Sequence, residues 1–366
     1  MNVLQICDYA ARYRGNFIEP LDYLKNSTFG KTDKMYFSFP TRMLERKNAW
    51  YAEFEKVNDV LIYGNSARSK IIGFREFIKK NDIDIVHTHF TDLKTDLCVK
   101  LACMGLGVKK LKHYRSSFGT FNKVKRMTAR LCYRGWSAIL CVSPHIASEA
   151  KKNIPSCQTL ILYNAVYFPR LDEYEKIERA SWNIPEDAVL CFAIGYDYKL
   201  KGIDLACEAV AELRKKTNAY LAVSVASNVE KITEQITQQF GEFPEWVKIL
   251  PPRQDIASYY KFADIYIQAS RSEGFCSAIV EAAYCGKIVV ASDCPGMLSH
   301  AQPNFDFLWY KNCDADSLAE KLEQAVIKKD DNELLERNRQ SAIENYGIDS
   351  MAKKLYRIYK DITERR

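Results

Sequence analysis

Two glutamates, Glu273 and Glu281, flank the point where a loop is expected to turn into a buried helix. Glu273 lies in "SRSEGF", and Glu281 lies in "AIVEAAYC", where most of its neighbours are apolar. Burying a carboxylate without a partner is costly, and the hydroxyl groups of a sugar would be suitable partners. A structural alternative also stands, in which Glu273 complements the helix dipole and Glu281 pairs with an arginine.

Lysines precede a second expected helix, in the segment "AIGYDYKLKGIDLACEA". A strand ending near Gly195 is followed there by Lys199 and Lys201, and then by the helix. Lysines at a helix N-terminus can neutralise a diphosphate, with help from free backbone N–H groups. Gly274, next to Glu273, allows the close backbone approach that a ligand requires. These residues are consistent with a site for a sugar and a diphosphate, although surface lysines beside a glycine turn are common elsewhere.

Other cofactor sites find little support in the sequence. The first expected loop, "CDYAARYRGNF", has a single glycine, Gly15, so it lacks the G-x-G-x-x-G pattern of nicotinamide and flavin proteins. Two D-x-D strings, at residues 82–84 and 314–316, are of the kind that metal-dependent transferases use, but their positions favour a turn and a helix cap. The twelve cysteines include no CxxC pair, which predicts buried free thiols in a reducing cytoplasm. We therefore expect no metal and no cofactor.

The elements that must position these residues alternate between strand and helix. Short apolar segments such as "NVLQIC", "DIVHTHF", "AVLCFAIG" and "KIVVASD" are mostly separated by helix-length segments, which is typical of a parallel α/β sheet. At 366 residues and 47% hydrophobic content, the chain can bury two cores. We predict two Rossmann-like, doubly wound parallel-sheet domains that face each other across a cleft. Ligands of such sheets bind beyond the carboxyl ends of the strands.

A shift in composition marks the expected domain boundary. Residues 167–187, "YFPRLDEYEKIERASWNIPED", are charged, contain two prolines and show no alternation, which predicts a linker. It would join a first domain at residues 1–166 to a second domain at residues 188–346. Residues 347–366 are expected to form a C-terminal helix that packs back on the first domain. No run of 18 apolar residues predicts a membrane span.

The positive charge of the chain, formally +7, is concentrated in one region. The 52 residues between Asp96 and Glu149 contain no acidic residue and ten lysines or arginines. Within this region, "FNKVKRMTARLCYRGW" combines an apolar stripe with a basic stripe at helical spacing. The basic stripe comprises Lys123, Arg126, Arg130 and Arg134. It is either a solvated face or a face that rests on anionic lipid, at about 1 kcal/mol per basic residue. No nucleic-acid motif accompanies it.

Several of these segments together closely resemble the retaining GT-B glycosyltransferases of family 4, which use sugar nucleotides in cell-envelope and polysaccharide assembly. The resemblance is carried by E-G-F-x5-E with the following "EAAYCGKIVVASDCPG", and by "DIVHTHF", "CVSPHIA", "ILYNAV" and G-x5-KGID in the family's order. It covers most of the chain and is weakest before about residue 80. It implies that the first domain binds the acceptor and that the second domain binds the nucleotide-sugar.

The resemblance implies a role for each donor-site residue. Glu281 would bind the ribose hydroxyl groups of the donor nucleotide, and Glu273 would hold the transferred sugar. Lys201, assisted by Lys199, would neutralise the departing diphosphate. The backbone of three residues would also contact the sugar, namely Gly274, Phe275 and Cys276. Arg253, in a "PPR" loop, and Gly195 are placed on the donor side as well.

The first domain would contribute a histidine and a loop. His113, in "LKHYRSSFG", resembles the histidine that the family directs at the donor sugar. Arg14, Gly15 and Asn16 occupy the first loop, where acceptor and phosphates approach. One departure from the family stands at Tyr196, where many relatives have arginine. Either Lys199 supplies the second positive charge or diphosphate binding is weakened.

The resulting expectation is a retaining, metal-independent hexosyltransferase. It would move a sugar from a UDP-sugar, with a GDP-sugar as second choice, to a lipid-linked or polysaccharide acceptor in cell-envelope, capsule or exopolysaccharide synthesis. We expect it in the cytoplasm, peripheral on the anionic inner face of the plasma membrane and without nucleic-acid partners. The alternative is a non-catalytic GT-B protein that binds a sugar nucleotide or a partner subunit. An epimerase is disfavoured by the form of the E-x7-E motif, and a phosphorylase by the length of the chain.

Overall fold

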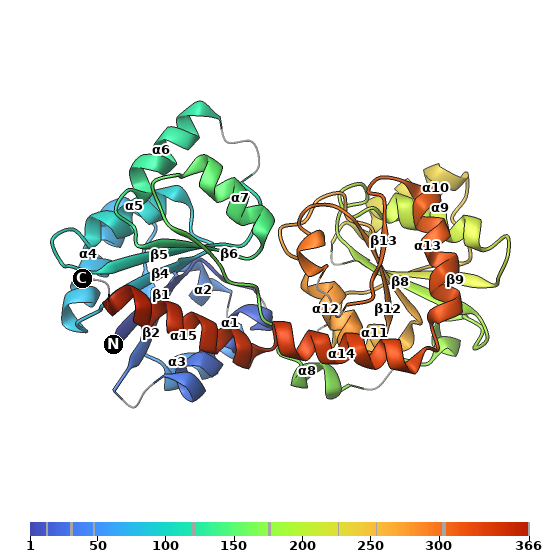
Figure 1. Ribbon diagram of the computed structural model, residues 1–366, viewed down its shortest axis with the longest axis horizontal. Helices are drawn as coiled ribbons and strands as arrows, with labels where there is room; N and C mark the ends of the chain where they lie inside the picture. Colours follow the sequence, from blue (N-terminus) through green and yellow to red (C-terminus); the bar gives the residue numbers. More distant parts are fainter. Residues whose placement is uncertain are drawn as a thin grey trace. The chain divides into compact units, whose positions relative to one another are not determined.

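The computed structural model describes residues 1–11, 14–29, 32–46, 48–118, 122–174, 177–225, 227–253, 255–301 and 305–364. The chain divides into two compact units (Figure 1). The first unit comprises Met1–Ala165 and Ile348–Arg366, and the second comprises Val166–Gly347.

The first unit is built on a parallel sheet with the strand order β3-β2-β1-β4-β5-β6-β7. Its strands are β1 (Asn2–Cys7), β2 (Lys34–Pro40), β3 (Val60–Tyr63), β4 (Ile85–His89), β5 (Lys109–Tyr114), β6 (Ala138–Cys141) and β7 (Thr159–Ile161). Its helices are α1 (Gly15–Tyr23), the π-helix η1 (Leu24–Thr28), α2 (Arg42–Glu45), α3 (Ala49–Val57), α4 (Ala67–Lys80), α5 (Leu93–Ala102), α6 (Lys123–Tyr133), α7 (Pro144–Asn153) and α15 (Ile348–Glu364). Strands β1 and β4 are buried almost throughout, because helices cover both faces of the sheet.

The second unit repeats this plan with the strand order β10-β9-β8-β11-β12-β13, again parallel throughout. Its strands are β8 (Val189–Gly195), β9 (Ala219–Val225), β10 (Val247–Leu250), β11 (Ile265–Gln268), β12 (Ile288–Ser292) and β13 (Leu308–Tyr310). Its helices are α8 (Pro169–Asp172), η2 (Arg179–Trp182), α9 (Ile203–Leu213), α10 (Val229–Phe240), α11 (Ile256–Phe262), α12 (Ser277–Tyr284), η3 (Leu298–His300), α13 (Ala315–Lys328) and α14 (Asn332–Tyr346). The prediction of two doubly wound α/β domains is confirmed.

Each sheet has one topological switch point, where successive strands begin to be added on the opposite side of the first strand. In the first unit this point lies between β1 and β4, and in the second it lies between β8 and β11. Ligands of open α/β sheets bind beyond the carboxyl ends of the strands at such a point. The loops that follow these four strands are therefore the places to look for a site.

Residues 167–187, expected to be a linker, lie within the second unit and contain α8 and η2. Arg179 attaches this segment to the sheet. Its guanidinium donates to Asp264 at 2.8 Å and to the backbone carbonyl of Ala188 at 2.7 Å. The charged, non-alternating composition of the segment therefore reflects short helical turns that pair with the unit.

The C-terminal helix α15 completes the core of the first unit. Its buried face is formed by Ala352, Leu355, Tyr359 and Ile362. The hydroxyl group of Tyr359 accepts a hydrogen bond from Gln5 Nε2 at 2.9 Å and lies 2.7 Å from His87 Nδ1. A polar contact to β1 and β4 thus fixes the helix at one position on the sheet.

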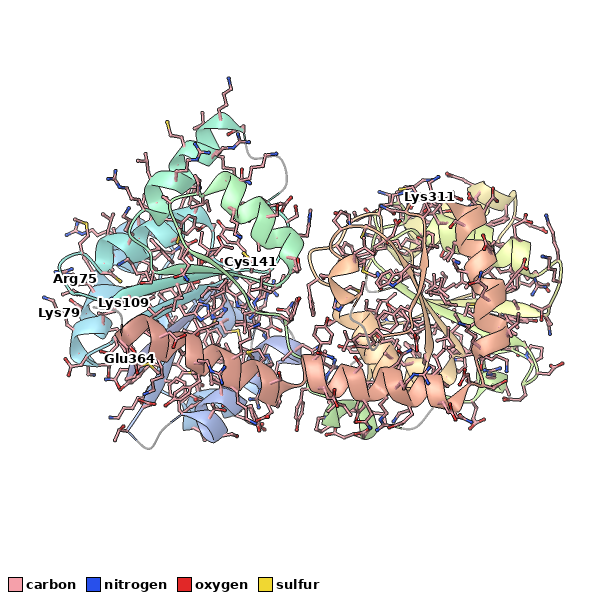
Figure 2. The ribbon with its side chains drawn as sticks, in the orientation of Figure 1. Arg75, Lys79, Lys109, Cys141, Lys311 and Glu364 are labelled. Atoms are coloured by element: carbon pink, nitrogen blue, oxygen red, sulfur yellow. The ribbon has the colours of Figure 1, made fainter. Side chains whose placement is uncertain are left out.

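All twelve cysteines are free thiols, as predicted, and ten of them are buried. Cys141, at the end of β6, is an example (Figure 2); burial raises the pKa of its thiol to about 12, so the thiol stays protonated. Cys285 is half-buried, and Cys313 is exposed. Among the helices of the described residues, none combines the length and the apolar character needed to span a bilayer.

Tyr359→Phe should lower the free energy of unfolding of the first unit by about 1–3 kcal/mol, because Gln5 and His87 would each lose the partner of a buried polar atom. Urea denaturation followed by circular dichroism measures this loss. Tyr23→Phe is the matched control, because its hydroxyl group makes an exposed hydrogen bond to Asp349. We expect a change of less than about 0.5 kcal/mol in the control, and equal losses in both variants would contradict the role of Tyr359.

Candidate functional site

Lys201 and Glu273 form an ion pair beyond the carboxyl ends of β8 and β11. Lys201 Nζ lies 2.6 Å from Glu273 Oε1, and only 16% and 13% of the two side chains are exposed. Gln268, the last residue of β11, lies 3.5 Å from the same carboxylate oxygen. The two motifs that sequence reasoning singled out separately thus meet in one place.

Two glycines allow these loops to come together. Gly202 has a φ of 65°, and a Cβ atom there would collide with the carbonyl group of Ala269. A Cβ atom on Gly296, after β12, would collide with the carbonyl group of Glu273. The loops after β8, β11 and β12 are therefore in backbone contact around the ion pair.

Lys201 keeps its positive charge in this setting. Burial lowers the pKa of its ammonium group, but the charge of Glu273 and the hydrogen bond to it raise the pKa by more, so the net shift is upward. Tyr196, at the position where the family resemblance leads us to expect arginine, has its ring centroid 5.2 Å from Lys201 Nζ. The aromatic ring thus contacts the lysine in a cation–π geometry.

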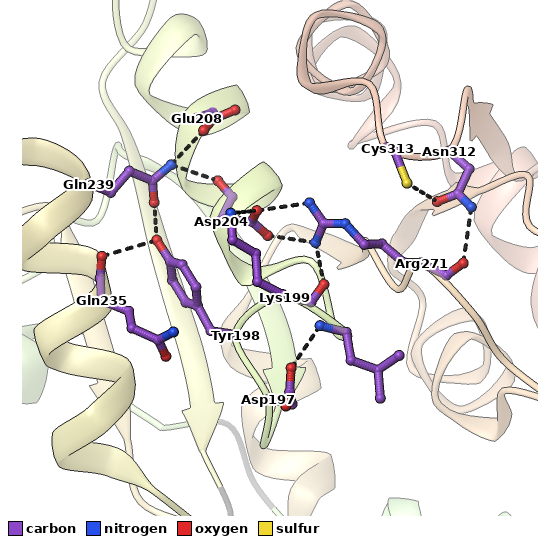
Figure 3. A network of polar contacts seen from close by, with 11 residues as sticks. Asp197, Tyr198, Lys199, Asp204, Glu208, Gln235, Gln239, Arg271, Asn312 and Cys313 are labelled. Atoms are coloured by element: carbon purple, nitrogen blue, oxygen red, sulfur yellow. Dashed lines mark hydrogen bonds and ion pairs between the residues drawn. The ribbon is translucent and has the colours of Figure 1, made fainter.

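Lys199 and Arg271 share a single carboxylate, that of the buried residue Asp204 (Figure 3). Lys199 Nζ lies 2.7 Å from Asp204 Oδ2, and Arg271 makes two contacts of 2.8 Å with the same group. Burial raises the pKa of Asp204, but the hydrogen bonds from Arg271 and then Lys199 lower it to a net value below the usual one. Because Lys199 and Arg271 share the single negative charge of Asp204, the three side chains together carry a net charge of one positive unit. Sequence reasoning missed Arg271, although it stands two residues before Glu273.

Glu281 is buried and already has partners within the second unit. Its Oε1 lies 2.7 Å from Arg170 Nη2 of α8, and its Oε2 lies 3.3 Å from the hydroxyl group of Tyr260 on α11. The structural alternative from the sequence, pairing with an arginine, is therefore realised. Binding of a ribose by Glu281 stays a prediction.

The residues after Glu273 turn their side chains into the protein. Phe275 and Cys276 are buried, and the Phe275 ring packs against His300 with centroids 4.4 Å apart. Contact of the backbone of these residues with a sugar, which the family resemblance implies, stays a prediction. Arg253 makes two contacts of 2.7 and 2.8 Å with Asp255 on the surface, and its contact with the donor nucleotide stays a prediction.

In the first unit, the strand register aligns three residues at the carboxyl ends of β1, β4 and β5. Cys7 pairs with His89, and His89 pairs with His113. His113 is buried, and burial, followed by the charge of Arg115, lowers its pKa well below the usual value, so the ring is neutral. Arg115 Nη2 lies 3.3 Å from His113 Nδ1. The predicted histidine thus stands beside an arginine that sequence reasoning did not select.

The first loop is organised differently from expectation. Arg14 pairs with Glu19 at 3.2 Å and with Asp22 at 2.8 Å, so its charge is compensated within α1. Gly15 begins α1 with a φ of 53°, and Asn16 follows it in the helix. Asn16 lines a pocket described below. Contact of these residues with phosphates stays a prediction.

Among the described residues, one cluster has the spacing of metal ligands: ring nitrogens of His87, His89 and His113 lie within 4.8 Å of one another. The charges of Arg115 and Lys112 depress the pKa values of all three rings, after burial itself, and the same charges oppose a bound cation. The two D-x-D strings have structural roles. Asp84 accepts the backbone N–H of Asn2, and Asp314 caps α13.

Helix α6 carries the predicted basic stripe, but its apolar stripe is the outward face. Val124, Met127 and Leu131 are 68%, 61% and 61% exposed, whereas Ala129, Cys132 and Tyr133 form the buried face. Two residues of the basic stripe reach the end of the neighbouring α7. Arg126 Nε donates to Asn153 Oδ1 at 3.2 Å, and Arg130 Nε donates to the Asn153 carbonyl at 3.0 Å. Lys123 and Arg134 are exposed. Phe121, the first residue of the predicted apolar stripe, lies outside the described residues.

Solved structures share this fold over the whole chain. A glycosyltransferase from Rickettsia africae ESF-5 superposes with a TM-score of 0.84 at 17% identity, covering 100% of this chain and 99% of that one. HepE from Anabaena, solved in complex with UDP, gives a TM-score of 0.80 at 14% identity and covers 99% and 100%. At these identities the likeness is one of fold.

Two curated proteins are similar in sequence over part of the chain. A Campylobacter jejuni N,N'-diacetylbacillosaminyl-diphospho-undecaprenol alpha-1,3-N-acetylgalactosaminyltransferase is 30% identical over 157 residues, 43% of this chain and 40% of that protein. The Escherichia coli O-antigen biosynthesis glycosyltransferase WclY is 27% identical over 143 residues, 39% of each protein. These matches span about two fifths of the length of the curated relatives. Residues 175–345, which lie within the second unit, match the family model "Glycosyl transferases group 1", and the chain as a whole has the GT-B fold.

Proposed function

We propose that the protein is a retaining, metal-independent glycosyltransferase of the family 4 type, which transfers a sugar from a nucleotide-sugar to a lipid-linked or polysaccharide acceptor. The observation that carries this proposal is the Lys201–Glu273 pair, beyond the carboxyl ends of β8 and β11 and inside the segment that matches the group 1 family. A UDP-sugar donor is supported by HepE, which has been solved with UDP-glucose. An envelope glycan as the product is supported by the names of the Campylobacter and Escherichia relatives.

The proposed chemistry needs positive charge where the donor breaks. When the bond between the anomeric carbon and the phosphate oxygen breaks, the nucleoside diphosphate takes the electron pair and gains negative charge. Lys201, the surplus charge of the Lys199–Asp204–Arg271 group and the N-terminal backbone of α9 would stabilise that charge. These groups do the work of a metal ion, so we propose that no metal is required.

Retention of configuration would follow from entry of the acceptor on the face that the diphosphate leaves. Glu273 already accepts a hydrogen bond from Lys201, and a carboxylate engaged in this way is a weaker nucleophile. This supports the front-face route over a covalent sugar intermediate on Glu273. The alternative function, a non-catalytic protein that binds a sugar nucleotide or a partner subunit, has Tyr196 as its only support.

The first unit is proposed to rest on the anionic cytoplasmic face of the membrane through α6. The exposed stripe of Val124, Met127 and Leu131 would enter the headgroup region, while Lys123 and Arg134 would meet lipid phosphates. Exposed apolar side chains of the neighbouring α5 and of the turn that follows it extend the apolar surface, namely Leu97, Leu101 and Met104. A lipid-linked acceptor would then be met at the surface in which it is anchored.

Glu281→Gln should weaken UDP binding about tenfold, because a neutral amide accepts hydrogen bonds from ribose less strongly than a carboxylate does. A thermal-shift titration with UDP, GDP, ADP and NAD, followed by calorimetry, measures this. Glu212→Gln, at an exposed position on α9, is the control and should bind as the wild type does. Unchanged UDP affinity in Glu281→Gln would remove this residue from the site, and no shift of the wild type with any nucleotide would favour the non-catalytic alternative.

Lys201→Ala should lower kcat about 100-fold or more, the usual cost of losing one group that stabilises a developing anion. The assay follows transfer from UDP-sugars with EDTA present, and nuclear magnetic resonance reads the anomeric configuration of the product. Lys215→Ala, in the same unit and exposed, should retain wild-type turnover. Loss of wild-type turnover in EDTA with recovery on adding a divalent metal would overturn metal independence, and an inverted product would overturn retention.

Met127→Asp combined with Leu131→Asp should reduce binding to anionic vesicles at least tenfold, because two apolar contacts are lost and negative charge is added. Co-flotation with vesicles of anionic and of zwitterionic lipid measures binding. Ile327→Asp is the control, since Ile327 is 85% exposed on α13 of the second unit. Equal flotation of the double variant and the control would exclude α6 as the contact.

A further inference from the structure

A small pocket lies entirely within the first unit, beyond the carboxyl ends of β4 and β5. The polar residues that line it include Asn16, His89, His113, Arg115, Tyr163 and Asn164. Its enclosed volume is about 10 Å³, which is the space of a single water molecule. The pocket can therefore admit one oxygen atom of a larger ligand whose remainder lies outside.

Arg115 is held rigidly in this pocket. Its Nη1 donates to Asn164 Oδ1, and its Nη2 lies 3.3 Å from His113 Nδ1. The guanidinium carbon lies 4.8 Å from the ring centroid of Phe17 and 5.4 Å from that of Phe90. Phe90 has a φ of 58°, a strained conformation for a bulky residue. Strain of this kind is retained when it positions a functional group.

No carboxylate of the described residues forms an ion pair with Arg115. The groups that act on its charge through space are Cys7, Tyr9 and Tyr359, which are neutral at pH 7. Burial lowers the pKa of the guanidinium to about 10, which reflects a desolvated charge without compensation. Arg14, by contrast, is paired with two acidic residues. A bound anion would therefore compensate the desolvated positive charge of Arg115.

Hydrogen bonding defines what else the pocket offers. Because His113 Nδ1 accepts from Arg115, the neutral ring carries its proton on Nε2. That buried N–H has no well-aligned hydrogen-bond partner, although the backbone of Leu162 acts on the ring. His89 Nε2 lies 2.8 Å from Gln5 Oε1, an acceptor, so His89 Nδ1 is left as a buried acceptor without a partner. Arg115 Nε is also a buried donor without a partner. The pocket therefore supplies two donors, one positive charge and one acceptor.

We propose that this pocket binds an anionic oxygen of the acceptor substrate, through Arg115 and His113. The acceptor's class is then an oxyanion that also carries hydroxyl groups, since His89 Nδ1 is suited to accept from a hydroxyl group. A diphosphate that links a sugar to a lipid and the carboxylate of an acidic sugar share this chemistry. The inference rests on the proposed function, whose acceptor it specifies.

The test uses the full chain saturated with UDP, so that added anions do not report on the second unit. Farnesyl diphosphate is titrated against farnesol, and glucuronate against glucose, by calorimetry and thermal shift. The variants are Arg115→Gln and Arg115→Lys. Arg75→Gln is the charge-matched control, because Arg75 lies at the edge of the same unit (Figure 2) and donates to the carbonyl groups of Ala102 and Met104.

The wild type and Arg75→Gln should bind one of the two anions at least tenfold more tightly than its neutral counterpart. Arg115→Gln should lose this preference, and Arg115→Lys should retain part of it. Preference for farnesyl diphosphate identifies a lipid diphosphate, and preference for glucuronate identifies an acidic sugar. If Arg115→Gln does not fold, the test rests on Arg115→Lys. Wild-type affinity of Arg115→Lys for the anion would show that the guanidinium group is not specifically required.

Equal binding of anionic and neutral probes by the wild type, or an unchanged preference in Arg115→Gln, would overturn the inference. Failure of the proposed function is a separate result, in which the wild type does not bind UDP. The anion titration is then repeated in Lys201→Ala without UDP. A preference for the anion that depends on Arg115 would still support the pocket as an anion site.

Discussion

The ion pair between Lys201 and Glu273 is the interaction on which the geometry of the second unit's loops depends. Desolvation would penalise either charge alone, so each residue holds the other in place. The close backbone contacts at Gly202 and Gly296 leave little freedom for any other arrangement. Under the proposed function, an incoming diphosphate would compete with Glu273 for the ammonium group of Lys201. Donor binding would then be an exchange of partners, in which the released carboxylate becomes available to the sugar.

Arg115 in the first unit is held in the opposite way. In the second unit Lys199, Arg271 and Arg170 each contact a carboxylate, whereas Arg115 in the first unit is surrounded by neutral groups. A cation paired with a carboxylate is stable without a ligand, and an anionic ligand must compete with that carboxylate. A buried cation without a carboxylate is unfavourable without a ligand, and an anionic ligand binds by removing this unfavourable desolvation free energy. Under the proposed function, the donor would bind by displacing a carboxylate from a cation, and the acceptor would bind to a cation that has no carboxylate partner.

The sequence was sufficient for the features that arise from local pattern. Apolar runs predict the strands, and strand ends predict that the G-x5-KG and E-G-F motifs lie close together, as Lys201 and Glu273 do. Contacts between residues far apart in the sequence could not be predicted from local pattern. Arg170, for example, contacts Glu281 across 111 positions, and no periodic pattern links the two. In α6 both stripes have helical spacing, so periodicity alone did not decide which face is outward. The linker prediction likewise had no means of finding the partners of Arg179.

The position of α15 has a consequence for the order in which the protein matures. The core of the first unit includes Leu355, Tyr359 and Ile362, which leave the ribosome after the entire second unit has been made. Domains fold as units during synthesis, usually from the N-terminus. Here the second unit can close first, while the earlier-made sheet waits for its last helix with apolar surface uncovered. During that interval the core of the first unit is incomplete, although its sheet was made first.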